Sequence, residues 1–259
     1  MLFAPPTGQY SRSGKSAIGL DSEEWVESGH LPSYHAAGMD AQPLKIGFGD
    51  ESVSGLLLRP NAAKALYLFA HGAGAGMTHK AMESNAQGLA ERGIATLRFQ
   101  FPYMEKGSRR PDPPRIAHAT VRAAAAEAAR LVPELPLFAG GRSFGGRMTS
   151  QAQAETPRPG VRGLAFLGFP LHPAGKPGVA RAEHLARVRI PMLFVSGSRD
   201  ALAELDLLRG VVAGLGERAS LHLVDQADHG FRVAARSGRT SADAAAEALD
   251  ALSSWVGAF

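Results

Sequence analysis

The 259-residue chain contains no cysteine. This absence excludes disulfide bonds, thiolate metal sites and a cysteine nucleophile, and it fits a cytoplasmic protein. The chain also lacks any apolar run near the roughly 18 residues that a membrane-spanning helix needs. Its N-terminus has no basic patch followed by an apolar stretch, which a secretory signal would require. We therefore expect a cytoplasmic protein that does not enter a membrane.

Charged residues are moderately scarce, at 20% of the chain, and the formal net charge is +4. The 28 basic residues are mostly arginines, and they are scattered along the sequence instead of forming a stripe with interleaved aromatics. This pattern does not indicate a nucleic-acid partner. No cluster of histidines and carboxylates has the spacing of metal ligands, so we expect neither a metal nor another cofactor.

Short apolar runs alternate with segments of helical periodicity from residue 42 onward. Strands are predicted at residues 43–48, 53–58, 65–70, 94–103, 137–139, 161–171, 191–195 and 219–224. Helices are predicted at residues 79–92, 115–132, 144–155, 205–215 and 241–256, the last with a capping box of Thr240 and Asp243. This alternation predicts an α/β fold, with a mostly parallel sheet covered by helices on both faces.

The predicted domain occupies residues 42–259, with no internal repeat, no second domain and no room for a large cap. Residues 1–41 carry Gly, Ser, Pro and charges without sustained periodicity, and we expect a poorly ordered extension there. Met39 stands directly before the first predicted strand. We hypothesise that it is the natural start; loss of folding or activity after deletion of residues 1–38 would contradict this.

The chain is organised around residues 135–148, where a predicted strand leads into Gly-Arg-Ser-Phe-Gly at residues 141–145 and then into a predicted helix. This G-x-S-x-G pattern is weak alone, but a strand before it and a helix after it strengthen it. A serine on such a turn has a strained backbone and an exposed hydroxyl. Ser143 is therefore the candidate nucleophile.

A serine nucleophile needs a histidine base and an acid that orients the base. On a sheet with this order of strands along the chain, the three should come in the order serine, acid, histidine. Asp200 follows the predicted strand 191–195, and His229 follows the last predicted strand. Asp200 could instead cap the next helix, so Asp206 and Asp225 remain alternative acids. Asp228 is adjacent to His229 and is poorly placed to reach its ring.

A glycine-rich loop, residues 71–76, follows the third predicted strand, where the second oxyanion donor is expected. We predict that the backbone N–H groups of Ala73 and Phe144 form the oxyanion hole. A phosphate-binding loop is the alternative, but neither the Walker nor the dinucleotide spacing is present. His71 is expected to be a structural hydrogen-bonding residue at the strand end.

Three residues are predicted to bind substrate: Gly74, Arg142 and His172. Arg142 and Arg147 flank the nucleophile, and either could bind an anionic substrate group, with help from Arg109 or Arg110. Pairing of these arginines with nearby acids is the alternative. A surface position is the alternative for His172.

The combination of these motifs resembles the α/β-hydrolase superfamily from about residue 44 to the C-terminus. The matching phrases are LFAHGAGAG, RFQFPYMEKG, GGRSFGGRM, LGFPLHPAGKP and DHGF. They are most similar to the capless, dienelactone-hydrolase-like group, and within it to predicted hydrolases related to the hydrolase-like domain of an NSL-complex subunit. The resemblance implies the α/β-hydrolase fold and a Ser143–Asp200–His229 triad, without giving a substrate.

We therefore expect a serine hydrolase that acts on a carboxylic ester or related acyl bond of a small molecule. Two alternatives remain. One is a non-catalytic interaction module that keeps the fold. The other is a different activity on the same scaffold, such as acyl transfer or haloperoxidase-like chemistry. The sequence predicts neither acyl or alcohol preference nor oligomeric state.

Overall fold

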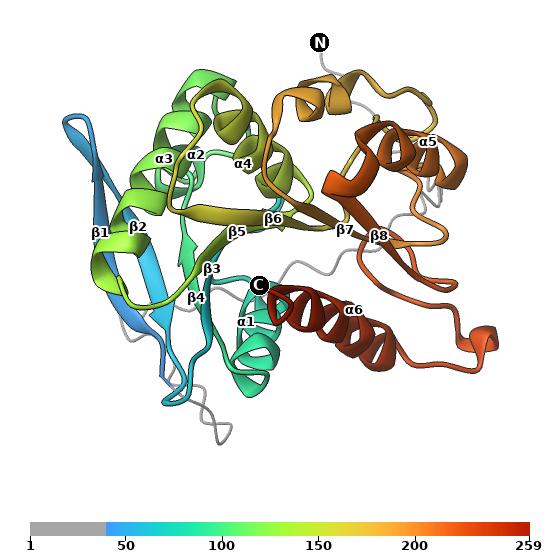
Figure 1. The fold of residues 1–259 in the computed structure, drawn as a ribbon, viewed down its shortest axis with the longest axis horizontal. Coiled ribbons are helices and arrows are strands. Elements are labelled where there is room, and N and C mark those ends of the chain that lie inside the picture. Colours follow the sequence, from blue (N-terminus) through green and yellow to red (C-terminus); the bar gives the residue numbers. More distant parts are fainter. Residues whose placement is uncertain (1–39) are drawn as a thin grey trace, which may run out of the picture. The chain divides into compact units, whose positions relative to one another are not determined.

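The computed structural model describes residues 40–259. The predicted N-terminal extension and the hypothesised start at Met39 lie outside this range, except for Asp40 and Ala41. Eight strands form one sheet in the order β1-β2-β4-β3-β5-β6-β7-β8 (Figure 1). The strands are β1 (Gln42–Phe48), β2 (Glu51–Leu58), β3 (Ala65–Ala70), β4 (Ile94–Phe99), β5 (Leu137–Arg142), β6 (Val161–Leu167), β7 (Met192–Gly197) and β8 (Ala219–Val224).

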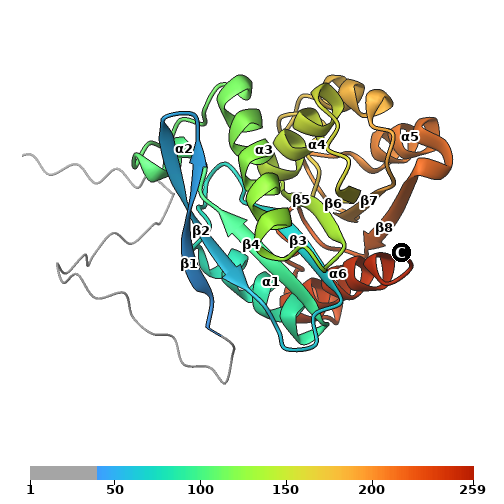
Figure 2. The same cartoon turned by 60° about the vertical axis from the view of Figure 1, so that its left-hand side comes forward.

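The sheet is parallel from β4 to β8, whereas β2 pairs antiparallel with β1 and with β4. The β1–β2 hairpin lies at one edge of the sheet, where β1 contacts a long helix, α3 (Figure 2). β3 and β4 are buried at every position. This burial explains their unbroken apolar sequences, because a parallel strand covered on both faces has no solvent-facing side.

Helices cover both faces of the sheet (Figures 1 and 2). α1 (Lys80–Glu91) and α6 (Ser241–Val256) pack on one face, where they share a core with β3, β5 and β7. α3 (Pro114–Leu131), α4 (Phe144–Glu155) and α5 (Leu205–Leu215) pack on the other face. The remaining elements are short: α2 (Pro102–Glu105), η1 (Ala180–Arg187), η2 (Gly216–Arg218) and η3 (Ala235–Ser237). The capping box predicted before α6 is confirmed.

Two predicted strands are too long. The strand expected over 94–103 ends at Phe99, because Pro102 occupies the first turn of α2 and its fixed φ favours a helix start. The strand expected over 161–171 ends at Leu167, because Gly168 adopts a φ of +73° and leaves the sheet. Conversely, β5 continues three residues beyond the predicted Ala139.

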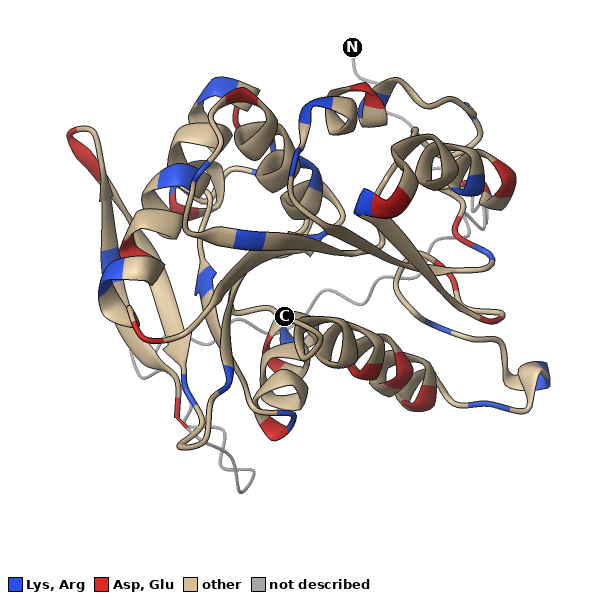
Figure 3. Ribbon diagram, in the orientation of Figure 1, with Lys and Arg blue, Asp and Glu red and all other residues tan. Residues whose placement is uncertain are grey.

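The connections at the carboxyl end of the sheet are short within residues 40–259. The segment between β6 and β7 contains only η1, so the described chain has no large cap. No helix in this range is long and apolar enough to cross a membrane. Lys and Arg are distributed over both helical layers and the sheet in the described part, whereas acidic residues recur along α6 (Figure 3).

Candidate active site

Ser143 stands at the sharp turn between β5 and α4, as predicted. It has a φ of +48° and a ψ of −116°, a conformation that is unfavourable for a residue with a Cβ. The turn brings α4 close to the end of β3, where a Cβ on Gly145 would lie 2.5 Å from the His71 carbonyl oxygen. Only glycine fits at position 145, which explains the second glycine of the G-x-S-x-G pattern.

The structure brings Ser143, His229 and Asp200 together. His229 Nε2 lies 2.8 Å from Ser143 Oγ, and His229 Nδ1 lies 2.7 Å from Asp200 Oδ2. Both distances fit hydrogen bonds, with Nδ1–H donating to the carboxylate and Nε2 accepting from the hydroxyl. The Asp200 side chain has no exposed surface, and its Oδ1 accepts a second hydrogen bond from the Leu202 N–H at 2.8 Å. The carboxylate is therefore held in one orientation.

The alternative acids occupy other positions. The Asp206 side chain is 98% exposed and faces Arg209 on α5. Asp225 accepts a hydrogen bond from Ser198 Oγ. Asp228 accepts the N–H groups of Gly230 and Arg232 within its own turn. None of the three has a hydrogen bond to His229 within the described chain.

Gly168 was not identified from the sequence, although its lack of a side chain leaves room for the His229 ring. A Cβ at this position would lie 3.3 Å from both Cε1 and Nδ1 of His229. Its φ of +73° is a second reason for glycine. The sequence shows a glycine within a predicted strand, but many strands contain or end in glycine. This pattern alone therefore does not identify Gly168 as a neighbour of His229.

The predicted oxyanion donors lie on two loops that adjoin Ser143. A Cβ on Gly72 would lie 3.9 Å from Ser143 Cβ, so the loop that carries Ala73 reaches the serine. Phe144 begins α4 directly after the serine. Within the described chain, the N–H groups of Ala73 and Phe144 make no hydrogen bond, which leaves both available to an acceptor.

Two side chains hold the loop that carries Ala73. His71 Nδ1 donates to the Gly72 carbonyl at 2.7 Å, and its Nε2 accepts the Phe101 N–H at 3.0 Å. The Tyr103 hydroxyl donates to the Ala73 carbonyl at 2.8 Å. Because these carbonyls are fixed, the Gly72–Ala73 peptide is fixed too, and so is the direction of its N–H. His71 is thus a structural hydrogen-bonding residue, as expected.

Burial shifts the pKa of both supporting side chains. It lowers the pKa of His71 to about 4, because a fully enclosed imidazolium would lose its hydration. Burial, together with the nearby Asp112 carboxylate, raises the pKa of Tyr103 to about 12. At neutral pH His71 is therefore neutral and Tyr103 keeps its proton, which are the forms that their hydrogen bonds require.

A cavity of about 410 Å³ opens at Ser143. Its lining is apolar on several sides and includes two arginines; it comprises Ala73, Pro111, Asp112, Pro114, Ser143, Phe144, Arg147, Met148, Pro170, Arg181 and Leu202. Arg147 and Arg181 therefore line the same cavity as Ser143. Arg181 was missed from the sequence, because η1 was not predicted.

The three predicted substrate-binding residues do not line this cavity. Arg142 lies over the Phe231 ring, with its guanidinium carbon 5.7 Å from the ring centroid. Both ring nitrogens of His172 have backbone partners, the Pro173 carbonyl at 2.9 Å and the Glu204 N–H at 3.2 Å. Gly74 is exposed. The geometry therefore gives none of the three a direct contact with a ligand in this cavity.

A second serine–histidine pair lies nearby. Ser150 Oγ is 2.7 Å from His184 Nε2, and it also donates to the Arg147 carbonyl at 2.9 Å. Because the hydroxyl has only one proton, His184 must donate to Ser150 and cannot accept from it. Ser150 is completely buried, and burial and the neighbouring Arg187 charge lower the pKa of His184 to about 4. This pair links α4 to η1 and is not arranged for nucleophilic attack.

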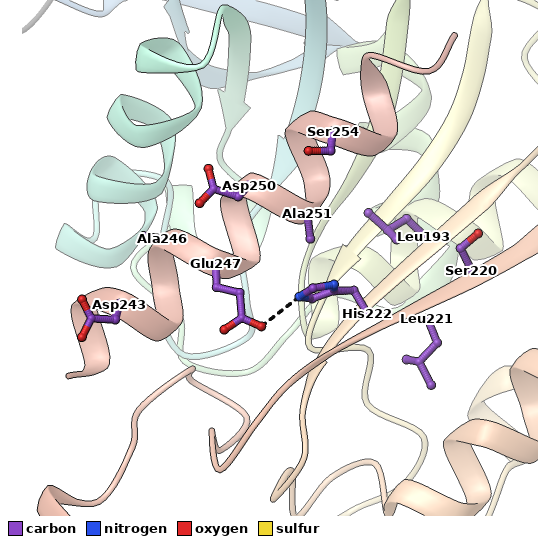
Figure 4. A pocket seen from close by; sticks show the side chains of 10 residues that line it. All are labelled: Leu193, Ser220, Leu221, His222, Asp243, Ala246, Glu247, Asp250, Ala251 and Ser254. Atoms are coloured by element: carbon purple, nitrogen blue, oxygen red, sulfur yellow. Dashed lines mark hydrogen bonds and ion pairs between the residues drawn. The ribbon is translucent and has the colours of Figure 1, made fainter. Parts of the chain in front are cut away.

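Another hollow, of about 660 Å³, lies between β8 and α6 (Figure 4). Its main polar contact is the hydrogen bond between His222 Nε2 and Glu247 Oε1, at 3.0 Å. Ser220 and Ser254 also line it, but neither has a hydrogen bond to His222 within the described chain. Among residues 40–259, no three His, Asp or Glu side chains are grouped so that they could hold a metal ion.

The model of the alpha/beta hydrolase domain family matches residues 63–257. The chain belongs to the alpha/beta hydrolase family. Dienelactone hydrolase from Anabaena variabilis has a similar structure, with a TM-score of 0.70 and 21% identity over 85% of this chain and 98% of that chain. The lidless α/β serine hydrolase from Xanthomonas campestris has a TM-score of 0.65 and 19% identity over 83% and 95%, respectively.

The esterase domain of a Rhodothermus marinus protein is also similar, with a TM-score of 0.63 and 20% identity over 84% of this hydrolase and 98% of that chain. At these identities the structural similarity supports the fold only. It agrees with the eight-stranded sheet and with the absence of a large cap in the described part. The relation to the NSL-complex subunit stays a prediction.

Proposed function

We propose that this alpha/beta hydrolase is a cytoplasmic serine hydrolase that cleaves a carboxylic ester or related acyl bond of a small molecule. The supporting observation is the continuous hydrogen-bonded series Asp200–His229–Ser143 at the mouth of a cavity, with distances of 2.7 and 2.8 Å. Two proteins of similar structure, an esterase domain and a dienelactone hydrolase, are compatible with this class of reaction.

In the first half-reaction, Ser143 Oγ attacks the carbonyl carbon while its proton passes to His229 Nε2. Asp200 accepts from Nδ1–H and stabilises the imidazolium that forms. The negative charge that develops on the carbonyl oxygen is stabilised by the N–H groups of Ala73 and Phe144. His229 then returns the proton to the leaving alcohol, and the acyl group remains on Ser143.

In the second half-reaction, His229 takes a proton from water, and the resulting hydroxide attacks the acyl carbon. The tetrahedral intermediate collapses, the Ser143–acyl bond breaks and His229 reprotonates the serine. These groups complete the reaction without a cofactor. Because the cavity opens directly at the serine and the described chain has no large cap, water has access to the acyl-enzyme.

Labelling with a fluorophosphonate probe tests the proposal directly, because such probes react with activated serine hydroxyls. We expect labelling of the wild-type protein and none of Ser143→Ala. Ser150→Ala is the matched control, because it removes a second histidine-bonded serine hydroxyl, which lies within α4, and it should be labelled. Unchanged labelling of Ser143→Ala would refute the nucleophile assignment, and an unlabelled wild type would favour a non-catalytic module.

A further inference from the structure

We propose that Arg147 and Arg181 form an anion subsite beside Ser143, so that the preferred substrate is an ester that also carries a carboxylate. The inference rests on the proposed function and adds the chemical class of the substrate. It is based on the position of the two guanidinium groups in the cavity and on the partners they lack in the described chain.

Both arginines line the cavity that opens at the nucleophile. Arg147 follows Ser143 by one helical turn, about 6 Å along the axis at about 1.5 Å per residue. Side chains of a helix lean toward its N-terminus, which directs Arg147 back toward the serine. Consistent with this, its guanidinium carbon lies 5.9 Å from the centroid of the Phe144 ring.

Neither guanidinium is neutralised within residues 40–259. The arginines that form ion pairs in this range are Arg59, Arg92, Arg122, Arg130, Arg209 and Arg239. Arg147 Nε is buried and has no hydrogen-bond partner among these residues, which is unusual for a buried donor. The terminal guanidinium nitrogens of Arg147 are not buried in this way, and an oxyanion in the cavity would accept from them.

The two arginines also act on each other. Burial and the positive charge of Arg181 both lower the pKa of Arg147. By contrast, the Asp228 charge favours the charged form of buried Arg142. Two like charges near each other with no carboxylate within ion-pair distance are unfavourable unless an anion binds.

The charge balance of the cavity favours a carboxylate over a dianionic phosphate. Asp112 is the acid that lines the same cavity, and it accepts the Tyr103 N–H at 2.9 Å. Two arginines and one aspartate give a formal charge of +1, which one carboxylate neutralises. The remaining lining, which includes Met148, Pro170 and Leu202, is apolar and suits the carbon chain between the carboxylate and the ester.

The test compares 4-nitrophenyl esters of straight-chain acids with mono-4-nitrophenyl esters of dicarboxylic acids of equal length, from succinate to adipate. We expect a higher kcat/KM for the carboxylate-bearing member of at least one pair. The ratio of charged to neutral kcat/KM should fall about 10- to 100-fold in Arg181→Met and in Arg147→Met, because hydrogen bonds to a charged group are lost. A monoester with a terminal phosphate in place of the carboxylate tests the alternative anion.

Arg187→Met is the matched control, because Arg187 belongs to the same η1 segment but is exposed and does not line the cavity. Its charged-to-neutral ratio should equal that of the wild type. The free dicarboxylates should also slow fluorophosphonate labelling of Ser143 in the wild type and less so in Arg181→Met, a readout that needs no turnover.

The outcomes separate this proposal from the proposed function. Labelling and hydrolysis of neutral esters without any carboxylate preference or protection would overturn the anion subsite and leave the serine hydrolase intact. Preference for the phosphate-bearing ester would overturn the assignment of a carboxylate. A wild-type protein that the probe does not label would instead refute the catalytic serine itself.

Discussion

Two serine–histidine pairs have similar distances but different surroundings: Ser143 directly precedes α4, and Ser150 lies within this helix, seven residues later. Ser143 Oγ lies 2.8 Å from His229, and Ser150 Oγ lies 2.7 Å from His184. The first serine has a positive φ at a cavity mouth and no other acceptor for its proton within the described chain. The second donates its proton to a carbonyl and is completely buried. A short serine–histidine distance is therefore not enough to identify a nucleophile. The proposed nucleophile also has access to a cavity and a histidine that is free to accept its proton.

The largest expected effect concerns Asp200, the carboxylate that accepts a hydrogen bond from His229. Asp200→Asn should lower kcat/KM for an ester by roughly 10⁴-fold, because the amide no longer stabilises the imidazolium and favours the wrong tautomer. Asp206→Asn and Asp225→Asn are the controls and should retain activity. Steady-state kinetics measure the effect, and a loss in Asp225→Asn with none in Asp200→Asn would reverse the assignment.

The next prediction concerns the pH dependence of the free energy of unfolding, to which two buried histidines contribute. The folded-state pKa values of His71 and His184 are lowered to about 4 from the usual 6.5. Between these values the unfolded chain binds more protons, so the free energy of unfolding falls as the pH falls from 6.5 toward 4. We expect a loss of roughly 2–4 kcal/mol, at about 1.4 kcal/mol per pKa unit discounted for partial exposure. Urea titrations across this range should show it, with a shallower slope for His184→Gln.

The buried pair should matter for stability and not for labelling. Ser150→Ala leaves the His184 N–H without its acceptor, which should lower the free energy of unfolding by about 1–3 kcal/mol. The double variant Ser150→Ala/His184→Leu should recover part of this loss, because both polar groups are removed. Urea unfolding measures both variants; equal stability of Ser150→Ala and wild type would contradict the role given to this pair.

The smallest expected effect concerns the loop that carries Ala73. Tyr103→Phe removes the hydrogen bond to the Ala73 carbonyl and should lower kcat about fivefold, since one neutral hydrogen bond contributes about 1 kcal/mol. KM should change little, because the loss acts on the oxyanion more than on the bound substrate. A change in KM with kcat unaltered would show that Tyr103 acts on binding instead.

The alternation of strands and helices, the turn at Ser143 and the proximity of Asp200 and His229 follow from local patterns. Parallel strands end at one edge, so residues after different strands meet there. Arg181 could not be predicted in the same way, because η1 has no regular helical pattern and its position depends on packing against α4. Arg142 and His172, which were predicted to bind substrate, show the converse case. Their neighbourhood in sequence suggested the cavity, but tertiary contacts direct them elsewhere.

The backbone at Ser143 has a consequence for how such a protein would lose its activity. Glycine would relieve a strain of about 1–3 kcal/mol at this position, whereas alanine would keep it. Ser143→Gly should therefore unfold at higher urea than Ser143→Ala, and a midpoint at or below that of alanine would contradict this. In a gene copy no longer under selection for catalysis, Ser143→Gly would therefore abolish the activity and at the same time stabilise the fold.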